Sequence, residues 1–278
     1  MRVRFTKMHG AGNDFVLIDD RDGSFPRDRN VLAAIGARGT GVGCEGIILV
    51  RRSDRLDFRM TFFNPDGSEA EMCGNGARCV AAFAREIGAA PSDRMRFETL
   101  AGDVQAEILR PAIPQPRNLS TSQLVKIAMP QPRDLRDDFI NSGVPHRIVP
   151  VEDLASVDVE GEGRRIRYSA EFAPDGTNVD FVTYRAPHDV SIRTYERGVE
   201  AETGACGTGA VAAALVGVAQ YGLSFPVRVR TVKGFELVVG GEFDGTSFGA
   251  VTLTGPVQRV FDGEIDLASL DTEAVNRG

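Results

Sequence analysis

The sequence has 278 residues, which is enough for two domains of ordinary size. Its 32 basic and 39 acidic residues give a formal net charge of −7, which argues against a nucleic-acid or anionic-membrane partner. No apolar run approaches the ~20 residues that a membrane span needs, and the start of the chain lacks the apolar core of a signal peptide. We therefore expect a cytoplasmic protein whose four cysteines are reduced.

The first half of the chain predicts strands on both sides of one apolar helix. We expect strands at residues 3–5, 15–18, 47–51, 58–63, 95–99 and 104–109. Asp28 can cap a helix through about Ala37. The apolar helix follows Cys73 and ends near Gly88, and a helix that is apolar on nearly all sides must be buried. This order predicts a sheet wrapped around a helix.

A proline-rich segment, residues 111–117, separates the two halves and predicts a domain boundary. We divide the chain into residues 1–116, to which residues 257–278 return, and residues 117–256. The second half repeats the order of elements, with a second apolar helix between Cys206 and Gly222. Its strands are expected at residues 124–129, 147–151, 179–184, 191–195, 227–231, 235–239 and 250–253, while residues 164–172 are ambiguous between helix and strand. The predicted fold class is α/β of the α+β type, with two pseudo-symmetric domains, each a mostly antiparallel sheet around a central buried helix.

Each apolar helix is preceded by a cysteine and two glycines, Cys73-Gly74-Asn75-Gly76 in the first half and Cys206-Gly207-Thr208-Gly209 in the second. The first turn of a helix has unpaired N–H groups and a partial positive charge, so it binds carboxylates and lowers the pKa of a cysteine placed there. One such tetrapeptide alone would be explained better by a small buried cysteine. Packing gives no reason to place it at both helix starts, so the repeat favours a functional role.

Two thiols at two such helix ends suit one reaction class, the movement of a proton from one face of a carbon to the other beside a carboxylate. One thiolate would remove the proton and the other thiol would supply one, while the N–H groups stabilise the enolate-like charge. The cysteines do not predict a metal site, because Cys73 and Cys79 are on different helix faces and the three histidines are scattered. We expect Cys44 and Cys79 to be structural.

The motifs together resemble those of the diaminopimelate epimerase family, in order and over nearly the whole chain. The matching segments are Met8-His9-Gly10-Ala11-Gly12-Asn13-Asp14-Phe15, Phe63-Asn64-Pro65-Asp66-Gly67-Ser68, Cys73-Gly74-Asn75-Gly76-Ala77-Arg78-Cys79, Glu196-Arg197-Gly198 and Ala205-Cys206-Gly207-Thr208-Gly209. The resemblance implies a cofactor-independent epimerase that interconverts LL- and meso-diaminopimelate, in lysine and peptidoglycan-precursor synthesis. It also implies two similar α/β domains with the site in the cleft between them, a homodimer, no metal and a small amino-acid substrate.

The resemblance further implies a role for each matching residue. Cys73 and Cys206 would be the two acid/base thiols, with Asn13 near the reacting amino group. The carboxylate at the reacting carbon would bind the backbone N–H groups of Gly74, Asn75, Gly207 and Thr208. The distal end of the substrate would bind Asn64, Asn178 and Arg197, and a guanidinium can grip a carboxylate bidentately. Glu196 and His146 would orient or tune the thiols, and Glu196 would also line the substrate site.

Two departures from the family pattern concern the distal end. Val144 stands before Pro145-His146 where many members have asparagine, and Gly46 follows Glu45 where some have glutamine. Both leave the distal specificity open, so a racemase of another amino acid, of the histidine or proline type, is the alternative. A non-catalytic thiol-redox or ligand-binding protein is the rival from another class; it would use a disulfide between the cysteines as its working state.

Overall fold

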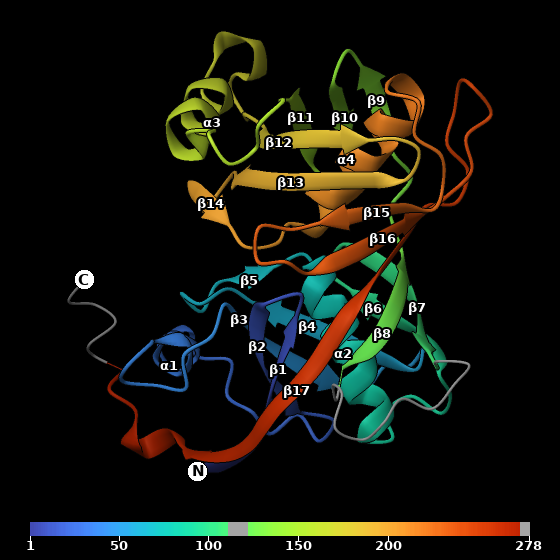
Figure 1. Cartoon of the computed structure of the whole chain (residues 1–278). Helices are drawn as coiled ribbons and strands as arrows, with labels where there is room; N and C mark the ends of the chain where they lie inside the picture. The colour runs from blue at the N-terminus through green and yellow to red at the C-terminus, as the bar shows by residue number, and fades with distance from the viewer. Residues whose placement is uncertain (111–121, 273–278) are drawn as a thin grey trace. The chain divides into compact units, whose positions relative to one another are not determined.

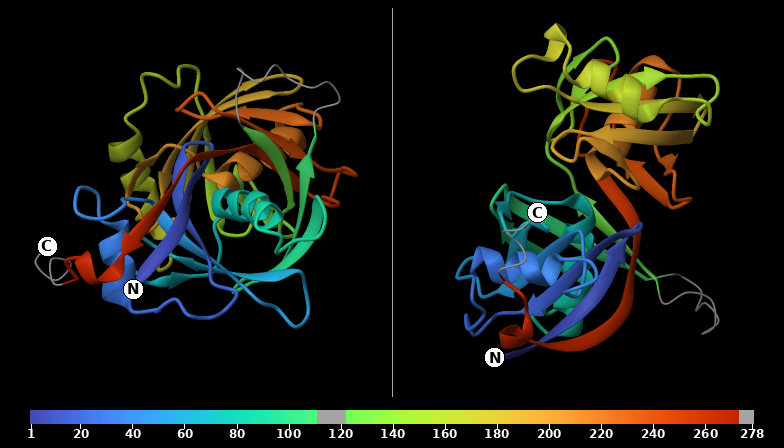
Figure 2. Two further views of the ribbon diagram at one scale, coloured as in Figure 1. Left: turned by 90° about the horizontal axis from the view of Figure 1, so that it is seen from below. Right: turned by 90° about the vertical axis from the view of Figure 1, so that its left-hand side faces the viewer.

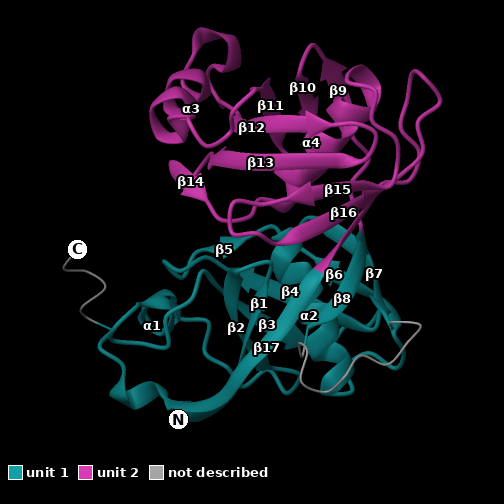
Figure 3. Cartoon of the chain, viewed as in Figure 1, with its two compact units in different colours: residues 1–127, 256–278 teal, residues 128–255 magenta. Residues whose placement is uncertain are grey.

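The computed structural model describes residues 1–110 and 122–272 and divides into two compact units (Figures 1 and 3). Unit 1 comprises Met1–Ile127 and Pro256–Gly278, and unit 2 comprises Ala128–Gly255. Each unit is a mostly antiparallel sheet around one buried helix, which confirms the predicted fold class. None of the described helices is both long and apolar enough to cross a membrane.

Unit 1 surrounds helix α2 with strands (Figure 2). Five neighbouring pairs of strands are antiparallel: β1–β2, β3–β4, β4–β5, β6–β7 and β7–β8. Two pairs are parallel: β2–β3 and β4–β6. The last strand, β17, pairs with both β1 and β8 and so closes the ring. The elements are β1 Arg2–Gly10, β2 Asn13–Asp19, α1 Arg29–Gly36, β3 Gly46–Arg51, β4 Phe58–Phe63, β5 Glu69–Ala70, α2 Gly74–Glu86, β6 Arg94–Thr99, β7 Gly102–Leu109, β8 Gln123–Ala128 and β17 Thr252–Asp266.

Unit 2 repeats this succession of pairings around helix α4, with β10 to β17 in the places of β1 to β8. The two parallel pairs of unit 2 are β11–β12, which corresponds to β2–β3, and β13–β15, which corresponds to β4–β6. The sequence shows no such identity beyond the two cysteine–glycine motifs. The elements are β9 Arg133–Arg136, β10 Phe139–Asn141, β11 Pro145–Pro150, α3 Val159–Arg167, η1 Ala170–Phe172, β12 Asn178–Arg185, β13 Asp189–Glu196, β14 Ala201–Thr203, α4 Gly207–Gln220, β15 Val227–Arg230 and β16 Glu236–Gly240, and a short 3₁₀ turn, η2 Leu267–Ser269, follows β17.

The two central helices are buried because small apolar side chains cover nearly their whole surface. Ala210 to Val216 in α4 and Ala77 to Ala84 in α2 are all buried. The outer helices have one apolar face only. Leu32 and Ile35 of α1 join a separate cluster on the other side of the unit 1 sheet, and Val159 of α3 does the same in unit 2.

Several predicted boundaries need correction. The glycine-rich loop between the first two strands is a two-residue turn, because β1 extends to Gly10 and β2 starts at Asn13. The ambiguous segment at 164–172 is helical, as α3 followed by a 3₁₀ turn, and the loop before Cys206 contains the short strand β14. Strand β17 runs unbroken past Gly255-Pro256, because it pairs with β16 before this point and with β1 after it.

The expected domain boundary at 116/117 lies outside the described residues. Strand β8 was expected in the second half of the chain. Its residues up to Ile127 belong instead to unit 1. The reason is its hydrogen bonding, since β8 continues the sheet of unit 1 by pairing with β7.

Candidate active site

Helix α2 begins directly after Cys73, as its motif predicts. Cys73 is the N-cap residue, has extended backbone geometry, and is half-buried. Its carbonyl accepts the first helical hydrogen bond from Ala77 at 2.7 Å. Its thiol donates to Oδ1 of Asn13 at 3.6 Å, so the structure brings together two of the predicted site residues in unit 1. The N–H groups of Gly74 and Asn75 belong to the first turn of α2, ahead of the helix's own i to i−4 hydrogen bonds.

The turn between β1 and β2 presents Asn13 to this helix end. Ala11 and Gly12 have φ angles of +53° and +83°, which two-residue hairpins require and glycine adopts readily. The backbone of Gly10 lies against the helix, where a β-carbon would approach the carbonyl oxygen of Asn75 to 2.8 Å. Glycine is therefore needed at position 10 for the turn to reach Cys73. The amide of Asn13 also donates to Glu45, which fixes its orientation.

Helix α4 begins in the same way after Cys206, which is 9 % exposed. The Cys206 sulfur accepts a hydrogen bond from the backbone N–H of Gly209 at 3.4 Å and lies 3.4 Å from the hydroxyl of Thr208. The carbonyl of Thr208 accepts from the hydroxyl of Ser142 at 2.8 Å, which ties the helix start to the loop before β11. The thiol therefore has a fixed position within unit 2.

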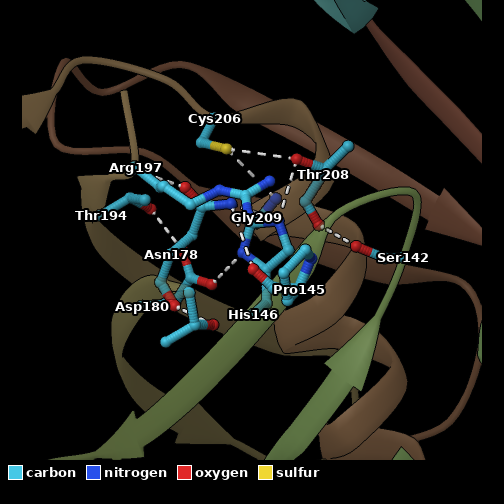
Figure 4. A network of polar contacts seen from close by, with 11 residues as sticks. Ser142, Pro145, His146, Asn178, Asp180, Thr194, Arg197, Cys206, Thr208 and Gly209 are labelled. Carbon is cyan, nitrogen blue, oxygen red and sulfur yellow. Dashed lines mark hydrogen bonds and ion pairs between the residues drawn. The ribbon is translucent and has the colours of Figure 1, made fainter. Parts of the chain in front are cut away.

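A buried chain of polar contacts leads from Cys206 to Asp180 (Figure 4). Nε2 of His146 lies 3.0 Å from Oγ1 of Thr208, and Nδ1 lies 2.6 Å from Oδ2 of Asp180. Because a carboxylate only accepts, Nδ1 carries a hydrogen, and in the neutral ring Nε2 then accepts from the Thr208 hydroxyl. That hydroxyl oxygen can then accept from the Cys206 thiol. The other oxygen of Asp180 accepts from the hydroxyl of Thr194 at 2.6 Å, so both carboxylate oxygens are bonded.

His146 and Thr208 were predicted from the sequence as site residues, whereas Asp180 was not. Asp180 follows Asn178 by two positions on β12, so both side chains point to the same face of the sheet. Asn178 in turn pairs with His146 in the parallel β11–β12 register. The sequence signal that could have indicated Asp180 is its position, two residues after the predicted site residue Asn178 on a predicted strand.

Asn178 and Arg197, expected at the distal end of the substrate, contact each other in unit 2. Oδ1 of Asn178 accepts from the backbone N–H of Arg197 at 2.7 Å, and its amide donates to the carbonyl of Pro145 at 3.2 Å. The guanidinium of Arg197 donates to the carbonyl of Asp175 at 3.3 Å. The Asn178 side chain therefore holds the backbone of Arg197 in position, and the Arg197 guanidinium lies against the backbone at Asp175.

Asn64, the third residue expected at the distal end, belongs to the turn after β4. Its side chain donates to the hydroxyl of Ser68 at 3.1 Å, and its backbone N–H donates to the carbonyl of Ser68 at 2.8 Å. The substrate roles of Asn64, Asn178 and Arg197 remain predictions.

The charges around Cys206 keep its thiol protonated. Burial raises the pKa of Cys206 well above its ordinary value, and the negative charges of Glu196 and Asp180 raise it further. The hydrogen bonds that the Cys206 sulfur makes with Thr208 and Gly209 act in the opposite direction but do not compensate. Burial also raises the pKa of Cys44 and of Cys79, which supports the structural role expected of these two cysteines.

Among residues 1–110 and 122–272, no group of three or more histidine, cysteine, aspartate or glutamate side chains is arranged to hold a metal ion. The same residues contain no disulfide.

Comparison with known proteins shows the family to which the chain belongs. The family model described as diaminopimelate epimerase matches residues 5–113 and 139–260. The diaminopimelate epimerase of Aquifex aeolicus is 44 % identical over 286 aligned positions, which cover 95 % of this chain and 98 % of that protein. These matches extend over both cysteine–glycine motifs.

Two solved structures share the fold at low sequence identity. A phenazine biosynthesis protein of the PhzF family from Bacillus anthracis has a TM-score of 0.70 and 16 % identity, and the match covers 96 % of this chain and 99 % of that one. A probable proline racemase from Agrobacterium radiobacter has a TM-score of 0.69 and 17 % identity, with 98 % and 95 % covered. The fold alone therefore accommodates proteins with different names.

Proposed function

Because this chain belongs to the diaminopimelate epimerase family, we propose that it interconverts LL- and meso-diaminopimelate by moving the proton at one α-carbon, as a step of lysine and peptidoglycan-precursor synthesis. The observation that carries the proposal is the pair of helices α2 and α4, each of which starts immediately after a cysteine. In this mechanism one thiolate removes the α-proton and the other thiol delivers a proton to the opposite face. The reaction needs no cofactor.

The surroundings of Cys206 support its role as the acid. The negative charges of Glu196 and Asp180 and the buried position favour the neutral thiol, which holds the proton to be delivered. The base is then Cys73, whose sulfur is half-buried at the start of α2. When the substrate reacts in the reverse direction, the two roles exchange. In that direction Cys206 must first lose its proton: its thiol passes the proton to the hydroxyl of Thr208 as that hydroxyl passes its own to Nε2 of His146, and Asp180 balances the positive charge on the ring.

The first turns of α2 and α4 are suited to bind a negatively charged substrate group. In the proposed complex, the N–H groups of Gly74, Asn75, Gly207 and Thr208 bind the carboxylate next to the reacting carbon and stabilise the enolate-like transition state. Asn13 orients the amino group at that carbon. Asn64, Asn178 and Arg197 bind the distal amino-acid end, and this end distinguishes diaminopimelate from amino acids with one carboxylate.

The proposal is tested by deuterium incorporation. Purified protein without added cofactor, in heavy water, is expected to place deuterium at Cα of the product formed from LL-diaminopimelate. Cys73→Ala and Cys206→Ala should each abolish epimerisation, while Cys44→Ala, the matched control, should retain it. Equal rates on proline or histidine and on diaminopimelate would instead establish the racemase alternative. Epimerisation by the double variant Cys73→Ala/Cys206→Ala would overturn the two-thiol mechanism.

Two further features of the family resemblance belong to the proposal. The protein acts in the cytoplasm, where a reducing environment keeps both thiols available, and it forms a homodimer. Cell fractionation tests the first, and light scattering during size-exclusion chromatography tests the second. Activity that requires reductant after oxidation, rather than activity that requires oxidant, would distinguish the epimerase from a thiol-redox protein.

A further inference from the structure

Arg78 is a charged side chain in the centre of unit 1. It lies on helix α2, one turn after Cys73, and its exposed fraction is 0 %. Among the described residues it is the largest fully buried side chain. Arginine is almost never fully buried unless a carboxylate or other anion pairs with it, because removing a charge from water is costly.

The contacts of the Arg78 guanidinium are to neutral groups. Nη2 donates to Oδ1 of Asn75 at 2.6 Å and Nη1 donates to the carbonyl of Gly74 at 3.3 Å. Nε has no hydrogen-bond partner within the described part of the chain. No carboxylate of that part lies within 4.0 Å of the guanidinium in an ion pair, whereas most arginines on the surface of the unit have one. The positive charge therefore has no fixed counter-ion there.

Other charged groups on the strands packed against α2 are engaged elsewhere. These strands are β1, β2, β3, β4 and β7. Lys7 is the only buried cationic or acidic side chain among them, and it pairs with Asp14 at 2.5 Å. Glu107 pairs with Lys126 and Arg94, and Arg51 pairs with Asp20. Nδ1 of His9 accepts from the N–H of Gly12, and the remaining ionisable side chains of these strands are exposed.

The groups of its own motif that would act on Arg78 when ionised are the thiols of Cys73 and Cys79. Burial lowers the pKa of Arg78, and negative charge on Cys79 or Cys73 would raise it. Cys79 is fully buried and its own pKa is raised by burial, so it stays a neutral thiol. Cys73, which is half-buried, is left as the group that can carry the negative charge.

We propose that Arg78 is a positioning residue, a buried cation behind the first turn of α2 that favours the thiolate form of Cys73 and orients Asn75 for anion binding. The two contacts of the guanidinium are to the residues that follow Cys73 directly, so it acts through the same turn whose N–H groups face the substrate carboxylate. The partial positive charge of the helix dipole and the positive charge of the guanidinium therefore both act at the first turn of α2. This inference rests on the proposed base role of Cys73.

The test measures the ionisation of Cys73 without requiring catalysis. In a Cys206→Ala background, the rate of Cys73 alkylation by iodoacetamide is followed against pH, with the labelled peptide identified by mass spectrometry. The midpoint is expected below the ordinary cysteine value of about 8.5. Arg78→Met should raise it by about one pH unit or more, whereas Arg78→Lys, which retains the charge, should stay closer to the parent. Arg85→Met is the matched control, because it removes an exposed cation from the same helix, and it should leave the midpoint unchanged.

Two outcomes would overturn the proposal. One is a folded Arg78→Met protein, by near-ultraviolet circular dichroism, whose midpoint equals that of the parent. The other needs no variant of Arg78. It is a Cys73 alkylation midpoint in the parent that lies at or above the ordinary cysteine value, or that rises steeply as the salt concentration increases. A buried charge is screened much less than a surface charge, so the parent midpoint should vary little between low and high salt. If diaminopimelate is not the substrate, these alkylation results are unaffected, so failure of the proposed function is separable from failure of this inference.

Discussion

Oδ1 of Asp180 lies so close to Gly209 that a β-carbon on Gly209 would be 2.5 Å from it. The second glycine of the Cys206 motif is therefore the residue that lets the carboxylate of the His146–Asp180 pair pack against the start of α4. The corresponding Gly76 of the first motif has a different neighbourhood. There a β-carbon would meet the flexible ends of Ile48 and Met60, at 3.1 and 3.4 Å.

This difference predicts unequal effects of alanine at the two glycines. Gly209→Ala should lower the free energy of unfolding by about 1–3 kcal/mol, because the buried carboxylate must move away from its partners. Gly76→Ala should change it by less than about 1 kcal/mol, since two side-chain methyl groups can shift and alanine favours the helix. Urea unfolding curves of the two variants make the comparison. A loss of equal size in both would contradict the role assigned to Gly209.

Asp180 is expected to hold His146 in the tautomer with the hydrogen on Nδ1. Asp180→Asn can no longer accept from both Nδ1 and Thr194, so kcat should fall by on the order of 10²-fold, a typical contribution of one general acid–base group. Nitrogen NMR of the His146 ring should show mixed tautomers in the variant. Asp189→Asn, which removes an exposed carboxylate paired with Arg228, is the control and should leave both kcat and the His146 spectrum unchanged.

The ionisation of Cys206 should respond to its neighbours in a predictable direction. In a Cys73→Ser background, alkylation of Cys206 should have a midpoint above about 8.5, because burial and the charges of Glu196 and Asp180 raise its pKa. Removing negative charge with Glu196→Gln should lower the midpoint, and removing a hydrogen bond with Thr208→Val should raise it. Glu202→Gln alters a carboxylate paired with Arg193 and should have no effect. The opposite order of midpoints would show that the described charges do not control this thiol.

Asp14 should make unit 1 sensitive to acid. Burial alone would raise its pKa, but hydrogen bonds and charge interactions with Lys7 and Arg38 lower it below the ordinary value. A carboxylate with a lowered pKa in the folded state adds stability above the unfolded pKa of about 3.9, and this stability is lost as pH falls through the folded value.

The variant Asp14→Asn should therefore be less stable than the parent by about 1 kcal/mol near pH 7, a value reduced by solvent screening of the partly exposed Arg38 pair. The difference should shrink below pH 4. Thermal unfolding at several pH values measures it, with Asp54→Asn on the surface as the control. A difference that does not change with pH would mean that packing of Asp14, not its charge, stabilises the fold.

Local features of the sequence were sufficient to predict both central helices and most strands. Cys73 and Cys206 each start a helix, and Asp28 caps α1 by accepting from the N–H groups of Asn30 and Val31, as expected. These features are short-range. A helix start depends on a few consecutive residues, and the apolar composition of α2 and α4 requires that they be buried wherever they lie.

The polar environment of the site could be decided only by the tertiary structure. Asp180 is 34 positions from His146, and the two meet because β11 and β12 pair in parallel, a register that neither strand specifies by itself. Arg78 appeared in the sequence as one polar residue within an apolar helix. That no carboxylate of residues 1–110 and 122–272 pairs with it depends on every strand that surrounds α2. The sequence by itself determined where the thiols and the helix ends occur, because those depend on neighbouring residues. The tertiary structure decided which charges surround each thiol, because electrostatic interactions depend on distance in space and on burial, and not on separation along the chain.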